Sequence, residues 1–188
     1  VSAASFAVAG TGELASSVLE YRGTRQTVRN TPVTLLPAFK GEWHVAAGDV
    51  NADGVADTVY GTGTGTAAQV FVVDGRSNAV IWQAVPFEGL DLTKRGVFVA
   101  AGDVNRDGYA DVIAAPGKGT APVVNVFSGK LLVTQAPVAD ALLRSITVTT
   151  ATGPQPEGIF VAAADMNGDG KADIVTGSST APAVRVYD

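Results

Sequence analysis

The nine residues D-V-N-A-D-G-V-A-D, residues 49–57, return as D-V-N-R-D-G-Y-A-D at 103–111 and as D-M-N-G-D-G-K-A-D at 165–173. Each copy has oxygen-bearing side chains at positions 1, 3, 5 and 9 and a glycine at position 6. Because glycine permits a sharp backbone turn, such a loop can fold its oxygens around one point. Calcium takes about six to eight oxygen ligands in cages of this kind. The three copies therefore predict three calcium sites.

The expected side-chain ligands are the Asp and Asn residues at these four positions. They are Asp49, Asn51, Asp53 and Asp57 in the first loop, Asp103, Asn105, Asp107 and Asp111 in the second, and Asp165, Asn167, Asp169 and Asp173 in the third. These loops hold nine of the 18 acidic residues, so three divalent ions would change the formal charge from −5 to about +1. The acidity thus belongs to the predicted metal sites. The 13 basic residues are scattered, which argues against a nucleic-acid partner.

Two other interpretations of the loops are weaker. An EF-hand begins in the same way but needs a Glu at position 12 and a following helix. Position 12 is occupied here by Tyr60, Ala114 and Thr176, with β-branched residues nearby. Turns rich in Asp and Asn but without metal would leave three carboxylates facing one another in each loop. Calcium remains the favoured interpretation.

The sequence around the loops also repeats. A predicted strand precedes each loop (44–50, 97–104 and 159–166), a second follows it (56–61, 110–115 and 172–177), and a third follows a turn (69–75, 123–129 and 183–188). Apolar runs at 79–85 and 130–136 predict a fourth strand in two units. Four short strands in about 55 residues are typical of a propeller blade. The one helix-like stretch is 137–145.

The N-terminal stretch belongs to the same series. Residues 6–23 match the second and third strands of a unit, and 31–39 can supply a fourth. We expect one all-β domain over 1–188, a propeller-like array of four units at about 1–40, 41–94, 95–156 and 157–188. The first unit lacks its first strand and the last its fourth. The predicted calcium loops join first and second strands.

This pattern resembles the FG-GAP and VCBS-type repeats of integrin-α-like β-propellers, in their bacterial form. The resemblance covers essentially the whole chain and implies that the loops bind calcium through the residues given above. It also implies that the position-7 residues Val55, Tyr109 and Lys171 would contribute a backbone carbonyl. The family usually closes seven blades, and this chain has material for at most four.

Enzyme chemistry has little support in the sequence. There is no cysteine and a single histidine, His44, which we expect to be structural. Glu13, Glu20, Glu42, Glu88 and Glu157 form no motif for glycoside hydrolysis. Trp43 and Trp82 can serve as a sugar platform, although packing in the core is the default. We therefore expect a protein that is not an enzyme.

The expected function is that of an extracellular, calcium-binding structural or adhesion module. Its partners would be calcium and either a second copy of the chain or another cell-surface protein or glycan. No apolar run reaches the ~18 residues that span a membrane. The incomplete end units leave three arrangements open: a small closed propeller, a part of a longer one, or copies joined head to tail through open β edges into a ring or fibre. A lectin-like propeller and a non-catalytic part of a secreted enzyme are the alternatives.

Overall fold

The computed structural model describes residues 5–8, 17–22, 25–30, 35–36, 39, 41–87, 95–148, 158–178 and 183–188. These residues form four antiparallel sheets. The first contains β1 (Ser5–Val8), β2 (Ser17–Arg22) and β3 (Arg25–Asn30), and the second β4 (Trp43–Gly48), β5 (Asp57–Thr62), β6 (Val70–Val73) and β7 (Val80–Ala84). The third contains β8 (Val97–Gly102), β9 (Asp111–Pro116), β10 (Val123–Phe127) and β11 (Leu142–Thr147), and the fourth β12 (Ile159–Ala164), β13 (Asp173–Ser178) and β14 (Ala183–Tyr187).

The second and third sheets are simple meanders in which each strand pairs with the next along the chain. In both sheets the second strand, β5 or β9, is buried along its whole length. A strand that is covered on both faces has no need for polar alternation, which explains the apolar runs around Val59 and Ile113. The all-β expectation and the repetition of blade-like sheets are therefore confirmed.

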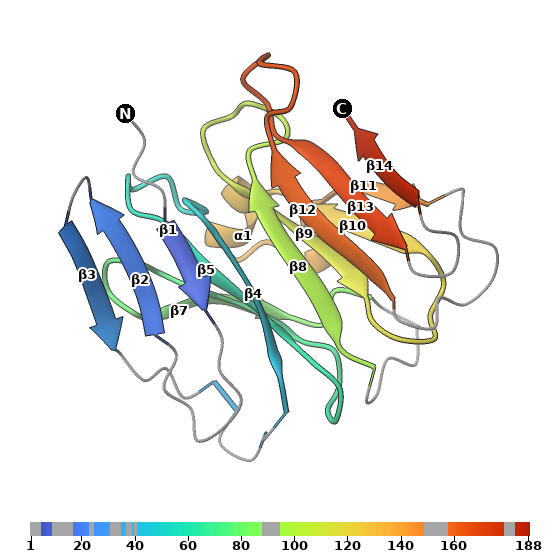
Figure 1. Cartoon of the computed structure of the whole chain (residues 1–188), viewed down its shortest axis with the longest axis horizontal. Coiled ribbons are helices and arrows are strands. Elements are labelled where there is room, and N and C mark those ends of the chain that lie inside the picture. Colours follow the sequence, from blue (N-terminus) through green and yellow to red (C-terminus); the bar gives the residue numbers. More distant parts are fainter. Residues whose placement is uncertain are drawn as a thin grey trace.

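The four sheets stack face to face (Figure 1). Strand β4 packs beside β8, β8 packs beside β12, and β1 lies against β4, so the first strands of successive sheets are neighbours. One apolar cluster fills the space between the second and third sheets, and another that between the third and fourth. The first and fourth sheets lie at opposite ends of this array (Figure 1).

One predicted strand in the third unit is wrong. Residues 130–136 were expected to form its fourth strand, but α1 (Gly129–Val133) occupies that stretch. Ser128 caps this helix by accepting a hydrogen bond from the backbone N–H of Leu131, and Leu132 is buried. A second short helix, α2 (Val138–Ala141), lies in the segment expected to be helix-like, and the fourth strand is β11.

The first unit also differs in detail. Its third strand is β3, which comes before the stretch 31–39 that was expected to supply a strand. Residues 31–34 and 37–38 of that stretch lie outside the described residues, and 35, 36 and 39 are not in a strand. No helix among the described residues is long and apolar enough to cross a membrane.

Candidate metal centres

Each of the three repeated loops joins the first two strands of a sheet. The loops are closed by the pairs Gly48 with Asp57, Gly102 with Asp111, and Ala164 with Asp173, where the two strands begin to pair. The position-9 aspartate of each loop is therefore also the first residue of the second strand. This placement agrees with the order of strands predicted from the sequence.

Inside the loop 49–57, side-chain oxygens accept hydrogen bonds from backbone N–H groups of the same loop. Asp49 accepts from Asp53 at 3.0 Å and from Gly54 at 2.8 Å. Asn51 accepts from the N–H of Asp53 at 2.9 Å, and Asp53 accepts from that of Val55 at 2.8 Å. These bonds turn the oxygens of positions 1, 3 and 5 toward the interior of the loop.

The other two loops repeat this geometry. The position-1 aspartates accept from the position-6 glycines, Gly108 to Asp103 at 2.9 Å and Gly170 to Asp165 at 3.0 Å. Asn105 and Asn167 accept from the N–H two residues later, as do Asp107 and Asp169. The third loop differs at one bond: Asp165 accepts from Gly168 at 2.6 Å, in place of the position-5 N–H that donates to Asp49 and Asp103. Apart from this bond, the three loops have the same pattern of hydrogen bonds.

The turn depends on backbone angles that favour glycine. The position-6 residues Gly54, Gly108 and Gly170 have φ of 84°, 89° and 85°. Position 4 is also left-handed, with φ of 58° at Ala52, 62° at Arg106 and 81° at Gly168. Because two of these three residues carry a Cβ, the loop holds a conformation that an isolated chain disfavours. The shared conformation is what brings positions 1, 3 and 5 together.

The position-9 aspartates are buried at the base of the loops. Asp57 accepts from the N–H groups of Val50, Asn51 and Gly75, and burial raises its pKa to about 6. Asp111 accepts from Val104 and Gly129, and burial raises its pKa to about 6 as well. A carboxylate that is buried in this way is costly to ionise, and a nearby cation would offset that cost.

The three loops are linked to one another. The backbone N–H of Ala110, in the second loop, donates to the carbonyl of Asp49 at 2.8 Å, and that of Ala172, in the third, donates to Asp103 at 2.7 Å. Arg106 also donates from the second loop to the carbonyl of Asp169 at 3.1 Å. A change in the shape of one loop would therefore move the backbone groups that are hydrogen-bonded to the neighbouring loop.

A basic side chain that follows the third strand of the sheet lies beside the first loop and another beside the second. Arg76 donates through Nε to Asp53 Oδ2 at 2.8 Å and through Nη2 to the carbonyl of the same residue at 2.9 Å. This hydrogen bond lowers the pKa of the Asp53 carboxyl. At the matching place in the third sheet, Lys130 lies over the ring of Tyr109, with Nζ 5.8 Å from its centroid.

The donor set of each loop fits a hard cation. It consists of carboxylate and amide oxygens, and calcium prefers such ligands. In the described residues, however, no group of three acidic or histidine side chains converges closely enough to hold a metal ion. The oxygens instead satisfy the loop's own N–H groups, and each retains a further lone pair. Small movements of side chains would therefore be needed to complete a cage.

The remaining candidate residues have structural surroundings. His44 lies with Nδ1 2.7 Å from the carbonyl oxygen of Val97, and its ring stacks on Phe98 at 4.2 Å. Trp43 is buried among Phe39, Tyr60 and Phe71, and Trp82 is buried near Phe127. Glu42 is exposed, Glu20 lies in β2, and Glu13, Glu88 and Glu157 lie outside the described residues.

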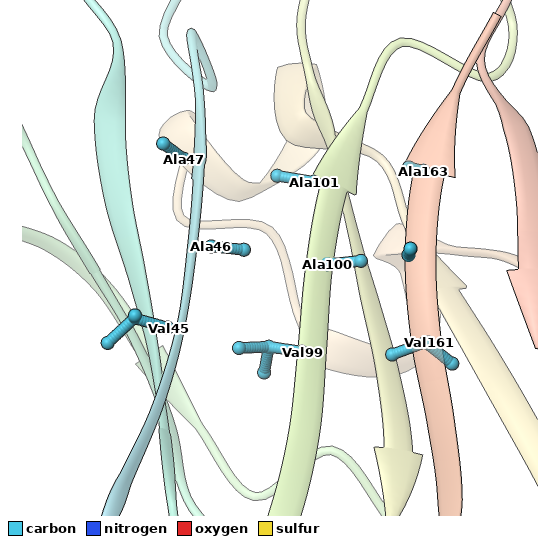
Figure 2. Close-up of a pocket in the computed structure, with 9 residues that line it drawn as sticks. Val45, Ala46, Ala47, Val99, Ala100, Ala101, Val161 and Ala163 are labelled. Carbon is cyan, nitrogen blue, oxygen red and sulfur yellow. The ribbon is translucent and has the colours of Figure 1, made fainter. Parts of the chain in front are cut away.

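A cavity of about 260 Å³ lies between the first strands of the second, third and fourth sheets. Figure 2 shows Val45, Val99 and Val161 on the three strands, with alanines next to them along each strand. All nine lining residues are valine or alanine. Small side chains at these positions allow the first strands to approach closely, and the cavity offers no polar side chain for catalysis.

The FG-GAP repeat family matches this chain at residues 95–131 and 158–187. These ranges span the first three strands of the third and fourth sheets together with their loops. These two matches support an FG-GAP-type repeat protein. The match does not distinguish the VCBS type. The second sheet lies outside the matched ranges but has the same strand order and loop. No curated protein matches the chain.

FG-GAP repeats are generally non-catalytic structural or adhesion repeats. They typically occur in extracellular or surface proteins.

Proposed function

We propose that this FG-GAP protein is an extracellular structural or adhesion module whose three loops bind calcium. The observation that carries the proposal is the repeated set of inward-turned oxygens at positions 1, 3 and 5, above a buried aspartate at position 9. One loop of this kind could be an ordinary turn. Three with the same hydrogen bonds favour a shared ligand.

Calcium would act here as a structural ion. When bound, it would supply positive charge to three carboxylates within nine residues and so hold the two strands of a hairpin at a fixed spacing. The ion would stabilise the carboxylates of the buried position-9 aspartates most, because burial disfavours their ionised form. Since the loops are hydrogen-bonded to one another, an ion in one loop would also steady the next.

Self-association of copies, head to tail, belongs to the same proposal. It is supported by the first and fourth sheets, which have three strands each among the described residues, where the second and third have four. The lectin alternative is less well supported, because both tryptophans are buried and neither forms an exposed sugar platform. A role as part of a secreted enzyme would require catalytic residues from outside this chain.

The test is the melting temperature of the chain in calcium and in a chelator. An ion at a hundredfold excess over its dissociation constant stabilises the fold by about 2.7 kcal/mol per site. Each kcal/mol moves the melting temperature of a chain of this size by about 2–4 °C. We therefore expect calcium to raise it by at least about 5 °C, and magnesium to raise it less.

The matched variants change three aspartates to asparagine. Asp49→Asn, Asp103→Asn and Asp165→Asn together remove one charge from each loop but keep an oxygen for the hydrogen bond from glycine. Asp74→Asn, Asp140→Asn and Asp188→Asn together remove the same charge outside the loops. We expect the first set to lose the calcium effect and the second to keep it. A wild-type melting curve that is the same in calcium and in chelator would refute the calcium sites.

A further inference from the structure

An arginine side chain joins the second loop to the third, in addition to the backbone bond between them. Arg106, at position 4 of the second loop, donates from Nη1 to the carbonyl oxygen of Asp169, at position 5 of the third, at 3.1 Å. A Cβ built on Gly170 would lie 3.2 Å from Cζ and 3.3 Å from Nε of Arg106. The guanidinium therefore lies against the peptide that joins Asp169 to Gly170.

This peptide also directs a predicted metal ligand. Its N–H, which belongs to Gly170, donates to Oδ2 of Asp165 at 3.0 Å, and Asp165 is the position-1 aspartate of the loop. One peptide thus accepts a hydrogen bond from the arginine and donates one to the aspartate. Because hydrogen bonds in a chain polarise one another, the bond from Arg106 strengthens the bond to Asp165. The direction of the Asp165 carboxylate therefore depends on both bonds.

The first loop has an arginine at the same carbonyl, although this arginine comes from a different part of the repeat. Arg76, which follows the third strand of the second sheet, donates from Nη2 to the carbonyl oxygen of Asp53 at 2.9 Å. The next N–H, that of Gly54, donates to Asp49 at 2.8 Å. Arg76 also bonds a carboxylate oxygen of Asp53, whereas the bond of Arg106 to the third loop goes to the backbone. Arg106 thus orients the peptide without occupying a ligand oxygen.

The first loop gives its own neighbour no arginine of this kind. Its position-4 residue is Ala52, which has the same left-handed backbone as Arg106, with φ of 58° and 62°, but no polar side chain. A Cβ built on Gly108 of the second loop would meet no described atom within 4 Å. The first two loops are joined by the backbone bond from Ala110 to Asp49, and the second and third have the equivalent bond. Arg106 is therefore an addition to a link that both pairs of loops have.

The third loop is the one that an outside contact can restrict most. Its residues 165–171 are all exposed, and position 4 is Gly168, whose backbone is freer than that of a residue with a Cβ. Asp165 accepts from Gly168 at 2.6 Å and from Gly170 at 3.0 Å. Both bonds to this carboxylate thus come from glycines, and Arg106 holds the peptide of one of them.

We propose that Arg106 is a positioning residue for the predicted metal site of the third loop, an inference that rests on the calcium binding proposed above. The guanidinium fixes the peptide between Asp169 and Gly170 and, through it, the carboxylate of Asp165. Less conformational freedom is then lost when a divalent cation binds. The positive charge of Arg106 acts in the opposite direction, but it is on an exposed side chain and is screened by salt. The hydrogen bond therefore has the larger effect.

The test measures the calcium affinity of one loop at a time by isothermal titration calorimetry. A chain with Asp49→Asn and Asp103→Asn keeps the third loop intact, and a chain with Asp49→Asn and Asp165→Asn keeps the second. Arg106→Ala is introduced into each of these chains. Alanine suits this position because Ala52 has nearly the same φ in the first loop.

A second variant and a matched control accompany it. Arg106→Met keeps the length of the side chain but has no hydrogen-bond donor, so it carries the same expectation if Arg106→Ala does not fold. The control is Arg144→Ala, which removes an equal charge and a bond between the same two sheets, from Nη1 to the carbonyl oxygen of Asp188 at 3.0 Å. Circular dichroism and a thermal melt in chelator establish that each variant is folded.

We expect both Arg106 variants to weaken calcium binding by the third loop about threefold to tenfold. Binding by the second loop, in which Arg106 itself lies, should change by less than about twofold. Arg144→Ala should leave the affinity of the third loop unchanged. A residue with only a structural role would lower the melting temperature of the metal-free chain without separating the two loops.

Unchanged binding by the third loop in the Arg106 variants would overturn the proposal. Stronger binding would also overturn it, because the charge of the arginine would then outweigh its positioning effect. Equal weakening of both loops would assign Arg106 to the general stability of the chain and not to the third site. If the wild type binds calcium and the third loop is indifferent to Arg106, this proposal fails alone, whereas a wild type that binds no calcium refutes the calcium proposal itself.

Discussion

The third and fourth sheets of this protein carry the same repeat, yet their surroundings differ. Val124 and Val126 in β10 are fully buried, whereas Val184 and Val186 in β14 are mostly exposed. Both pairs lie at alternate positions on the third strand of a sheet and point to the same face. The difference therefore arises from the neighbour and not from the residues themselves.

The loops of these two sheets show the same contrast. Asp111 accepts hydrogen bonds from Val104 in its own loop and from Gly129 beyond the third strand. The described residues give Asp173 one such donor, the N–H of Met166. The loop 165–173 is exposed over its first seven residues, while 103–111 is half-buried at several positions. A repeat is thus stabilised largely by the next sheet in the stack, as is usual for repeat proteins.

The largest expected effect comes from shortening the same side chain in both sheets. Val126→Ala removes two buried methyl groups and leaves a cavity, so we expect the free energy of unfolding to fall by about 2–3 kcal/mol. Val186→Ala should cost less than about 0.5 kcal/mol, because this side chain is already half exposed. Urea denaturation at a concentration where the chain is monomeric measures both. Equal losses would show that the fourth sheet is covered within the monomer.

The sequence predicted the three repeated loops and the first two strands of the second, third and fourth sheets. Those features rest on local chemistry: Asp, Asn and Gly set the turn, and alternating or continuous apolar residues set the strands. The predicted strand at 130–136 failed for a local reason as well. Ser128 can cap a helix, and Lys130, Leu131 and Leu132 are good helix formers, so the signal for α1 was present.

Two features could not be predicted from the local sequence. Strand β3 is largely polar, with Arg25, Gln26 and Arg29 among its six residues, and has no apolar alternation to mark it. The exposure of Val184 and Val186 depends on the next layer of the stack, which a strand's own sequence does not reveal. The calcium sites remain a prediction, because their donor atoms are in place but no described group of side chains is closed into a cage.

A smaller effect is expected at Gly61 and Gly177, which occupy the same position on the second and fourth sheets. Gly61→Ala would place a Cβ 2.5 Å from the carbonyl oxygen of Val97, so we expect the strands to shift at a cost of about 1–3 kcal/mol. Gly177→Ala meets only Phe160 at 3.9 Å and should be neutral or stabilising by up to about 1 kcal/mol. Thermal melts of the two variants at low concentration give the comparison. A destabilised Gly177→Ala would show that this face is packed in the monomer.

The smallest expected effect concerns the basic residue beside a loop, and it depends on the calcium proposal. Arg76 follows Gly75 and binds Asp53, whereas Lys130 follows Gly129 and lies over Tyr109 without an ion pair to its loop in the described residues. Because the guanidinium occupies one oxygen of a predicted ligand, it competes with a cation for Asp53.

The substitution Arg76→Gln should therefore strengthen calcium binding at the loop 49–57. The increase in affinity should be no more than about threefold, because the ion pair of Arg76 with Asp53 is exposed and screened by solvent. Lys130→Gln, the matched change in the third sheet, should alter the affinity of its loop less. Isothermal titration calorimetry with calcium measures the affinities of the Arg76→Gln and Lys130→Gln variants. Arg76→Lys serves as a further variant that keeps the charge but loses the Nε hydrogen bond. Weaker binding in Arg76→Gln would mean that the arginine helps to shape the loop, and the first loop would then be the best-formed of the three.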